Sequence, residues 1–330
     1  MRSAGRCWRV IVLVLGWNLA LGLMVALPLA QQIENDLGSS EAALRMRDGF
    51  DYPWWSAFEQ RQSGSFKTYA PNILGFGFAV RNLDLLLGGR LFGRLLLPGT
   101  IELAEPAADP SAPQPLDPLL TGLGVLYLVT QTFLYGGILT CLAGTPSRRS
   151  LASFASACGR FFGPCLRLAL VAGVAYLMIF TLNRWLGPWI DQQALEASSG
   201  RAAHAWVFGR LGALLLAIAL VHLTAGYARV GLVVGGRRSA VIAFGSALRL
   251  CLRRPALTLG HYLSVVLVSG IVLILYVLAD GGFEARGLLG LLWVFVLAQT
   301  WMAIRIGLRF ALAGGQIQIS RAMHLSRTPP

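Results

Sequence analysis

The sequence predicts an all-α, multi-pass membrane protein with six transmembrane helices. We expect these to form three parallel helical-hairpin repeats, with amphipathic elbow helices at the membrane interface. Three observations predict this class: the composition, the length of the apolar runs and the distribution of charge between loops. Of the 330 residues, 55% are hydrophobic and 13% are charged, whereas soluble domains usually carry about 25% charged residues. A chain this apolar cannot cover its surface with polar groups in water, so we expect a bilayer as its solvent.

Six apolar runs have the length of a membrane span. They cover residues 10–30, 118–142, 165–187, 207–234, 260–280 and 288–312. Each is close to the roughly 20 residues that a helix needs to cross about 30 Å of hydrocarbon. The runs do not alternate apolar and polar residues as barrel strands do, and a helix satisfies its own backbone hydrogen bonds in lipid. The chain therefore divides into an anchor helix (1–30), an outer loop (31–117), a five-span core (118–315) and a tail (316–330).

The first run resembles a secretion signal, because Arg2, Arg6 and Arg9 precede about twenty apolar residues. Its apolar part is longer than the usual 7–15 or so residues of a signal, and cleavage after Ala30 would put Pro28 where a small residue is wanted. We therefore expect an uncleaved anchor helix.

Acidic residues are confined to alternate loops. Of the fifteen in the chain, eleven lie between Glu34 and Asp117, and the other four are Asp191, Glu196, Asp280 and Glu284. All fall in or beside the loops after spans one, three and five, whereas the remaining loops and both termini carry arginine. Because basic residues near short loops stay in the cytoplasm, both termini are expected inside, with the protein in the inner membrane. The net charge of +13 is then mainly a topology signal and does not indicate nucleic-acid binding.

The cysteines favour the same layout. They are Cys7, Cys141, Cys158, Cys165 and Cys251. All lie near the predicted inner ends of spans or in inner loops, and none lies in the outer loop, where an oxidising compartment would favour disulfides. Their spacing contains no CxxC pair, so neither a zinc nor a redox site is expected.

Two inner segments indicate an internal repeat. RRSLASFASACGRFFGP runs from Arg148 to Pro164, and RRSAVIAFGSALRLCLRRP runs from Arg237 to Pro255. Both follow an even-numbered span and lead into an odd-numbered one. The copies begin near residues 1, 148 and 237 and share one orientation, so they are parallel repeats.

At helical spacing, both segments place arginines opposite an apolar face, which is the pattern of a helix lying in the membrane surface. We expect a proline, at 164 or 255, to break each surface helix where the chain enters the next span. The interfacial arginines expected to contact anionic lipid are Arg148, Arg149, Arg160, Arg238, Arg249 and Arg253. The alternative is that these elbows only anchor the topology.

Among the arginines inside predicted spans, three stand out. Arg229 and Arg305 each begin an Arg-x-Gly-Leu sequence, and Arg309 follows Arg305 by one helical turn. Because charge inside a span is costly, these three residues are the candidate site for an anionic headgroup. The alternative is that their side chains extend along the helix to reach the inner headgroups.

The outer loop contains DYPWWSAFEQRQ, then an apolar stretch at 76–97 that holds four charges, then a proline-rich linker. We expect short interfacial helices in the apolar stretch, since four charges argue against a seventh span. The loop is either a lid or partner-docking surface, or a packed cap without a ligand. Asp48 and Asp51 are its only candidate catalytic pair, and no GxSxG, HExxH or P-loop is present. No cofactor or metal is expected.

A loose motif runs from Arg229 through Ser246 and Ala247 to Arg253, Arg254 and Pro255. With it, residues 120–315 resemble a family of bacterial six-helix membrane proteins of mostly unknown function. That family includes the membrane domain attached to some glycerophosphodiester phosphodiesterases. The resemblance implies six helices in the inner membrane. It implies no phosphodiesterase activity, because the sequence has no segment that matches the soluble catalytic domain.

Three functions follow from these features. The first is a non-enzymatic membrane component that handles or senses lipid, or serves as a scaffold or accessory subunit of a transporter. The second is a permease that moves a small or lipid-like substrate with a partner. The third is a membrane enzyme acting on lipid headgroups at the outer face. The expected partners are anionic lipids and either further copies of the chain or transporter subunits.

Overall fold

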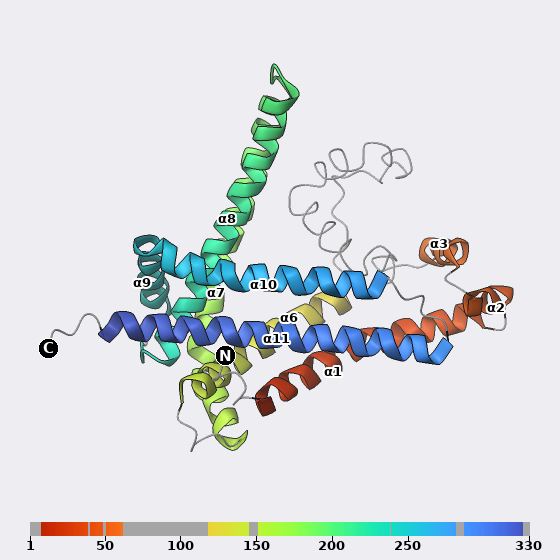
Figure 1. Ribbon diagram of the computed structural model, residues 1–330, viewed down its shortest axis with the longest axis horizontal. Helices are drawn as coiled ribbons and strands as arrows, with labels where there is room; N and C mark the ends of the chain where they lie inside the picture. The colour runs from red at the N-terminus through yellow and green to blue at the C-terminus, as the bar shows by residue number, and fades with distance from the viewer. Residues whose placement is uncertain are drawn as a thin grey trace.

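The computed structural model describes residues 8–38, 40–48, 51–61, 118–144, 151–237, 239–281 and 287–325, which form helices and no strand. The elements are α1 (Trp8–Leu37), α2 (Glu41–Asp48), α3 (Tyr52–Arg61), α6 (Pro118–Ala143), α7 (Leu151–Leu195), α8 (Gly200–Val233), α9 (Ala240–Arg253), α10 (Pro255–Gly281) and α11 (Gly287–Leu325) (Figure 1). The prediction of an all-helical chain is confirmed for these residues.

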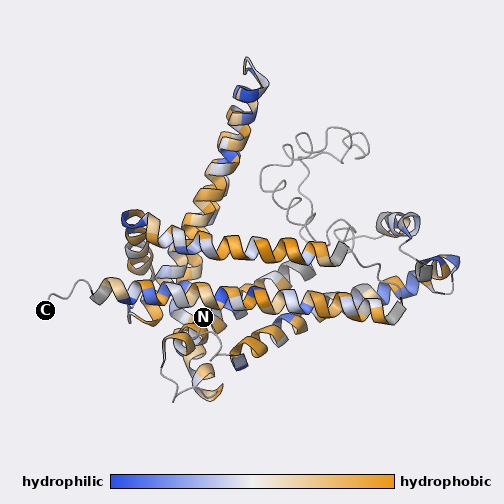
Figure 2. Ribbon diagram, viewed as in Figure 1, coloured by the Kyte–Doolittle hydropathy of each residue, from blue (hydrophilic) through white to orange (hydrophobic). Residues whose placement is uncertain are grey.

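Six of these helices are long and apolar enough to cross a membrane. The candidate spans are Trp8–Leu37, Gly122–Ala143, Leu151–Leu195, Gly200–Val233, Pro255–Ala279 and Leu292–Met323. Each overlaps one predicted run, so the prediction of a multi-pass protein with six spans is confirmed at this level. Figure 2 shows apolar residues along α10 and α11 and polar residues at the far tip of the α7–α8 hairpin.

Several spans are longer than the bilayer requires. α7 has 45 residues, or about 68 Å at roughly 1.5 Å per residue, against about 30 Å of hydrocarbon. α11 has 39 residues and ends at Leu325, so the predicted tail begins inside this helix, where Gln316 and Ile317 are buried.

The helices meet at one end and separate at the other. In Figure 1, α1, α6, α10 and α11 run in broadly similar directions, whereas the α7–α8 hairpin projects steeply away from α10 and α11. Val10 and Val14 of α1 pack with Leu134 of α6, Phe154 of α7 and Phe310 of α11. The buried core lies where these ends meet, and the apolar surfaces of the projecting hairpin and α10 are left exposed.

The two predicted elbows differ. α9 is a separate helix that ends at Arg253, and α10 begins at Pro255, so the break predicted at Pro255 is confirmed. The break predicted at Pro164 is wrong, because α7 continues through it. Tertiary contacts explain the continuity. Before the proline, Cys158 packs against α6, and after it Leu168 packs against α8, so both halves of α7 are held in line.

Gly137 of α6 lets α7 approach closely. A Cβ placed on this glycine would lie 2.5 Å from the Sγ of Cys158 and 2.6 Å from a ring carbon of Phe154. A glycine at such a crossing removes the side chain that would hold two helices apart. The first half of α7 therefore rests on α6.

A small cap covers the far end of α1. Ala42 of α2 and Trp54 and Phe58 of α3 are buried against Ile33 and Leu37 of α1. Arg61 of α3 forms an ion pair with Asp36 of α1 at 2.8 Å. The first part of the predicted outer loop is thus helical, and the interfacial helices predicted at 76–97 lie outside the described residues.

The described cysteines are of two kinds. Cys158, Cys165 and Cys251 are free and buried, whereas Cys141 takes part in a disulfide. The orientation of this end of α6 stays a prediction.

Candidate functional site

The structure places the three predicted span arginines around α6, α8 and α11. The guanidinium carbon of Arg229 on α8 lies 4.5 Å from the ring centroid of Tyr135 on α6. Arg309 on α11 donates a hydrogen bond from Nη1 to the hydroxyl of Tyr127 on α6 at 3.3 Å. Cation–π contact and a tyrosine hydroxyl orient a guanidinium without neutralising it.

Arg305 and Arg309 stand one helical turn apart on α11, and α11 contacts α8, which carries Arg229. Arg305 and Arg309 are exposed and Arg229 is half-buried. We call Arg229, Arg305 and Arg309 the span arginine cluster. Within the described ranges, no carboxylate lies within ion-pair distance of any of them.

Another arginine within a span, Arg210 of α8, is paired. Its Nη1 lies 3.2 Å from Oδ1 of Asp191 on α7, and its Nε donates to Oδ1 of Asn183 at 3.0 Å. The Arg210 side chain is 6% exposed and packs against Gly187. This arginine joins the two helices of the hairpin, and the sequence analysis did not identify it. The sequence feature that points to Arg210 is Asp191, one of the few acidic residues beside a span.

Three of the predicted interfacial arginines lie on exposed surfaces of the described helices. Arg160 is exposed on α7, with its guanidinium carbon 5.4 Å from the ring centroid of Phe161. Arg249 and Arg253 are exposed on α9. Arg148, Arg149 and Arg238 lie outside the described residues. The role of these arginines in lipid contact therefore stays a prediction.

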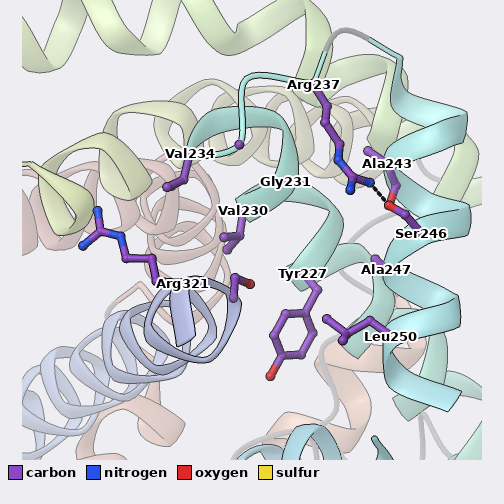
Figure 3. A pocket seen from close by; sticks show the side chains of 12 residues that line it. Tyr227, Val230, Gly231, Val234, Arg237, Ala243, Ser246, Ala247, Leu250 and Arg321 are labelled. Carbon is purple, nitrogen blue, oxygen red and sulfur yellow. Dashed lines mark hydrogen bonds between the residues drawn. The ribbon is translucent and has the colours of Figure 1, made fainter. Parts of the chain in front are cut away.

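A cavity of about 570 Å³ lies between α8, α9 and α11 (Figure 3). Its polar lining residues are Tyr227, Arg237, Ser246, Ser320 and Arg321, and most of the others are apolar. We call it the α8–α9–α11 pocket. Sequence reasoning did not predict it. Ser246 was identified only as a motif residue, since nothing in the sequence shows that α9 folds back beside α8.

The hydroxyl of Tyr227 is the deepest polar group of this pocket. The residue is 3% exposed, and within the described part of the chain its oxygen has no hydrogen-bond partner. Arg237 lies at the opposite end of the pocket (Figure 3), where its Nη1 donates to Oγ of Ser246. Arg321 points away from Arg237 and donates to the carbonyl of Ala143 at 2.9 Å.

The pocket ends where α8 and α11 touch. A Cβ placed on Gly226 would lie 2.5 Å from Nε2 of Gln316, so these helices are in direct contact beside Tyr227.

The predicted carboxylate pair has a structural use. Asp51 accepts from Nε of Arg45 at 2.7 Å and from the backbone N–H of Trp54 at 3.1 Å. The hydrogen bond from Arg45, followed by that from Trp54, lowers the pKa of Asp51 below its ordinary value. Asp51 thus stays ionised and caps α3. The side chain of Asp48 lies outside the described residues. No cluster of three metal-ligating side chains occurs among the residues that the structure places.

No protein-family model, curated protein or solved structure matches this chain. The resemblance to the membrane domain of glycerophosphodiester phosphodiesterases therefore stays a prediction, and the functional argument rests on the geometry of the chain itself.

Proposed function

We propose that this protein is a non-enzymatic, multi-pass protein of the bacterial inner membrane that binds anionic lipid through Arg229, Arg305 and Arg309. It acts as a lipid-handling component, or as an accessory subunit or scaffold of a transporter. The observation that carries the proposal is a set of three guanidinium groups on transmembrane helices without a carboxylate partner in the described residues. Charge inside a span is expensive and calls for a counter-charge.

The surroundings of the cluster favour a ligand from the bilayer. Arg305 and Arg309 are exposed on α11, and α10 beside them leaves its apolar surface uncovered. A lipid headgroup supplies the negative charge, while its acyl chains cover apolar surface. Tyr127 and Tyr135 hold two of the guanidinium groups in place, which lowers the entropy lost when an anion binds.

The test compares the anionic lipid that co-purifies with the full chain in mild detergent. Arg229→Gln combined with Arg305→Gln removes two charges, each contributing about 1 kcal/mol near an anionic headgroup. Affinity for anionic lipid is therefore expected to fall about thirtyfold. Mass spectrometry of extracted lipid measures the change.

The matched control removes two exposed arginines of the α7–α8 hairpin, by Arg184→Gln combined with Arg201→Gln. This variant should retain the wild-type amount of anionic lipid. An unchanged amount in the Arg229→Gln, Arg305→Gln variant would mean that these side chains only extend to the headgroup region, and the proposal would be wrong.

A permease is the second candidate, because the α8–α9–α11 pocket lies between spans four and six. A transport path needs a polar passage that continues along α8 and α11. The contact between Gly226 and Gln316 closes that route in this conformation. Transport would therefore require α8 and α11 to separate. A disulfide engineered across this contact should abolish transport of a substrate and leave lipid binding unchanged.

A further inference from the structure

We propose that the α8–α9–α11 pocket is a second, separate site, which binds a phosphate ester carrying an acyl chain, such as a single-chain glycerophospholipid. The site uses Arg237, Ser246 and Tyr227. None of these belongs to the span arginine cluster.

The first argument is the buried hydroxyl of Tyr227. More than nine-tenths of buried polar groups in proteins have a hydrogen-bond partner, and an exception calls for an explanation. Tyr227 is 3% exposed, borders the pocket, and has an oxygen without a partner within the described ranges. A ligand oxygen that reaches the inner end of the pocket would accept this hydrogen bond.

The second argument is the order of chemical groups along the pocket. Arg237 and Ser246 lie at one end and Tyr227 at the other (Figure 3). Between them the walls include apolar side chains of α8 and α9, such as Val230 and Ala247. A glycerophospholipid carries its groups in a matching order, with a phosphate first, an ester carbonyl deeper and an acyl chain beyond. Free phosphate would contact neither the apolar walls nor the hydroxyl of Tyr227.

The volume supports a ligand of limited size. Small-molecule sites in proteins usually enclose about 300–1,000 Å³, and this cavity encloses about 570 Å³. The guanidinium of Arg237 carries five N–H donors, of which the hydroxyl of Ser246 takes one. The remaining N–H donors of Arg237 are available to an anion, because no carboxylate forms an ion pair with Arg237 among the residues described.

The two sites lie on different sides of α8. Tyr227 and Arg229 are two residues apart, and two residues turn a helix by about 200°. Tyr227 accordingly faces α9 and α11, whereas Arg229 faces Tyr135 of α6. Binding at the α8–α9–α11 pocket is therefore independent of lipid binding at the span arginine cluster.

The test titrates oleoyl-lysophosphatidylglycerol into the full chain in phosphatidylcholine nanodiscs, with native mass spectrometry counting the bound lysolipid. Arg237→Gln should weaken binding about tenfold, because it removes charge-assisted hydrogen bonds to the phosphate. Tyr227→Phe should weaken binding about fivefold through loss of a single hydroxyl, which corresponds to about 1 kcal/mol. Tyr227→Phe preserves the shape of the side chain, so it tests the site even if other variants fold poorly.

Two controls separate this site from its surroundings. Arg253→Gln removes an exposed arginine of α9 that does not line the pocket and should bind as the wild type does. Arg237→Gln and Tyr227→Phe made in the Arg229→Gln, Arg305→Gln background should show the same losses, because the span arginine cluster then contributes little bound lysolipid. Failure of the proposed function and failure of this inference therefore give different results.

Three outcomes would overturn the inference. The first is equal lysolipid affinity in wild type, Arg237→Gln and Tyr227→Phe. The second is competition by inorganic phosphate or glycerol phosphate at the same concentration as the lysolipid, which would show that the pocket recognises a soluble phosphate and not a lipid. Competition by monooleoylglycerol at that concentration would likewise exclude a phosphate-specific site.

Discussion

Arg210 and Arg229 stand on the same helix and illustrate two ways to place a guanidinium group in an apolar segment. Arg210 is 6% exposed in its side chain and lies 3.2 Å from Asp191. Arg229 lies over the ring of Tyr135 and has no carboxylate beside it in the described residues. The first arginine is neutralised by its own chain and joins two helices. Arg229 keeps a charge that an external anion can pair with. A carboxylate partner within the chain therefore distinguishes a structural arginine from a candidate binding arginine.

The largest effect is expected when the paired arginine loses its carboxylate. Asp191→Asn removes the carboxylate that pairs with the buried Arg210 guanidinium, and breaking a fully buried pair costs about 3–5 kcal/mol. Because Asp191 is 43% exposed, solvent screening reduces this, and we expect a loss of about 2 kcal/mol in the free energy of unfolding. Thermal unfolding in detergent measures it. A change below about 0.5 kcal/mol would show that Arg210 does not need its pair.

The converse experiment gives the unpaired cluster a carboxylate. Tyr127→Glu replaces the hydroxyl that accepts from Arg309 with an anion of the chain itself. We expect bound anionic lipid to fall about fivefold, because the internal carboxylate competes with the headgroup for a charge contribution of about 1 kcal/mol. Tyr127→Gln, which adds no charge, is the control and should retain more lipid than Tyr127→Glu. Equal lipid in both variants would show that the cluster does not respond to charge.

A smaller effect is expected at the aromatic contact. Tyr135→Leu removes the ring beneath Arg229, which is 4.5 Å away, and a cation–π contact contributes about 0.5–2 kcal/mol depending on its desolvation. We expect a loss of about 1 kcal/mol in unfolding free energy, measured by thermal unfolding. Tyr135→Phe keeps the ring and should behave like the wild type. A loss of the same size in both variants would assign the effect to the hydroxyl.

The smallest effect is expected in the outer cap, where solvent screens the pair. Arg45 lowers the pKa of Asp51 in the folded cap below its ordinary value of 3.8. A lowered folded pKa means that the pair contributes stability above the unfolded pKa and loses it as pH falls through the folded pKa. Tryptophan fluorescence of Trp54 and Trp55 should therefore change only below about pH 4. Asp51→Asn should remove this acid transition, and an identical transition in that variant would contradict the assignment.

The predicted orientation, with both termini in the cytoplasm, has its own test. Cysteine-specific labelling from each side of the membrane is expected to reach an introduced cysteine at Ser320 from the cytoplasm and one at Gly200 from the outside. The opposite result would invert the proposed topology and move the α8–α9–α11 pocket to the outer leaflet.

Much of the helical framework could be predicted because it depends on local composition. An apolar run of about twenty residues specifies a transmembrane helix wherever it lies in the fold, and Pro255 ends α9 as a local steric rule requires. Pro164 shows the limit of that rule. The contacts of Cys158 with α6 and of Leu168 with α8 outweigh the local cost of a proline, and residues distant in sequence supply both contacts.

The candidate site could be predicted in part for the same reason. Arg229, Arg305 and Arg309 stand out because charge is rare in apolar segments, so their identity was visible in the sequence. Their tyrosine partners were not, because Tyr127 and Tyr135 are ordinary residues of α6 until that helix packs beside α8 and α11.

The sequence by itself determined that the chain is helical, that six segments suit a bilayer, and which residues place charge in those segments. These properties follow from the solvation of each side chain and need no knowledge of its neighbours. Only the tertiary structure decided which charges are paired, because hydrogen bonds and ion pairs depend on contacts between helices. It joined Arg210 to Asp191, left the span arginine cluster without a described carboxylate, and enclosed Tyr227 in a pocket formed by three helices.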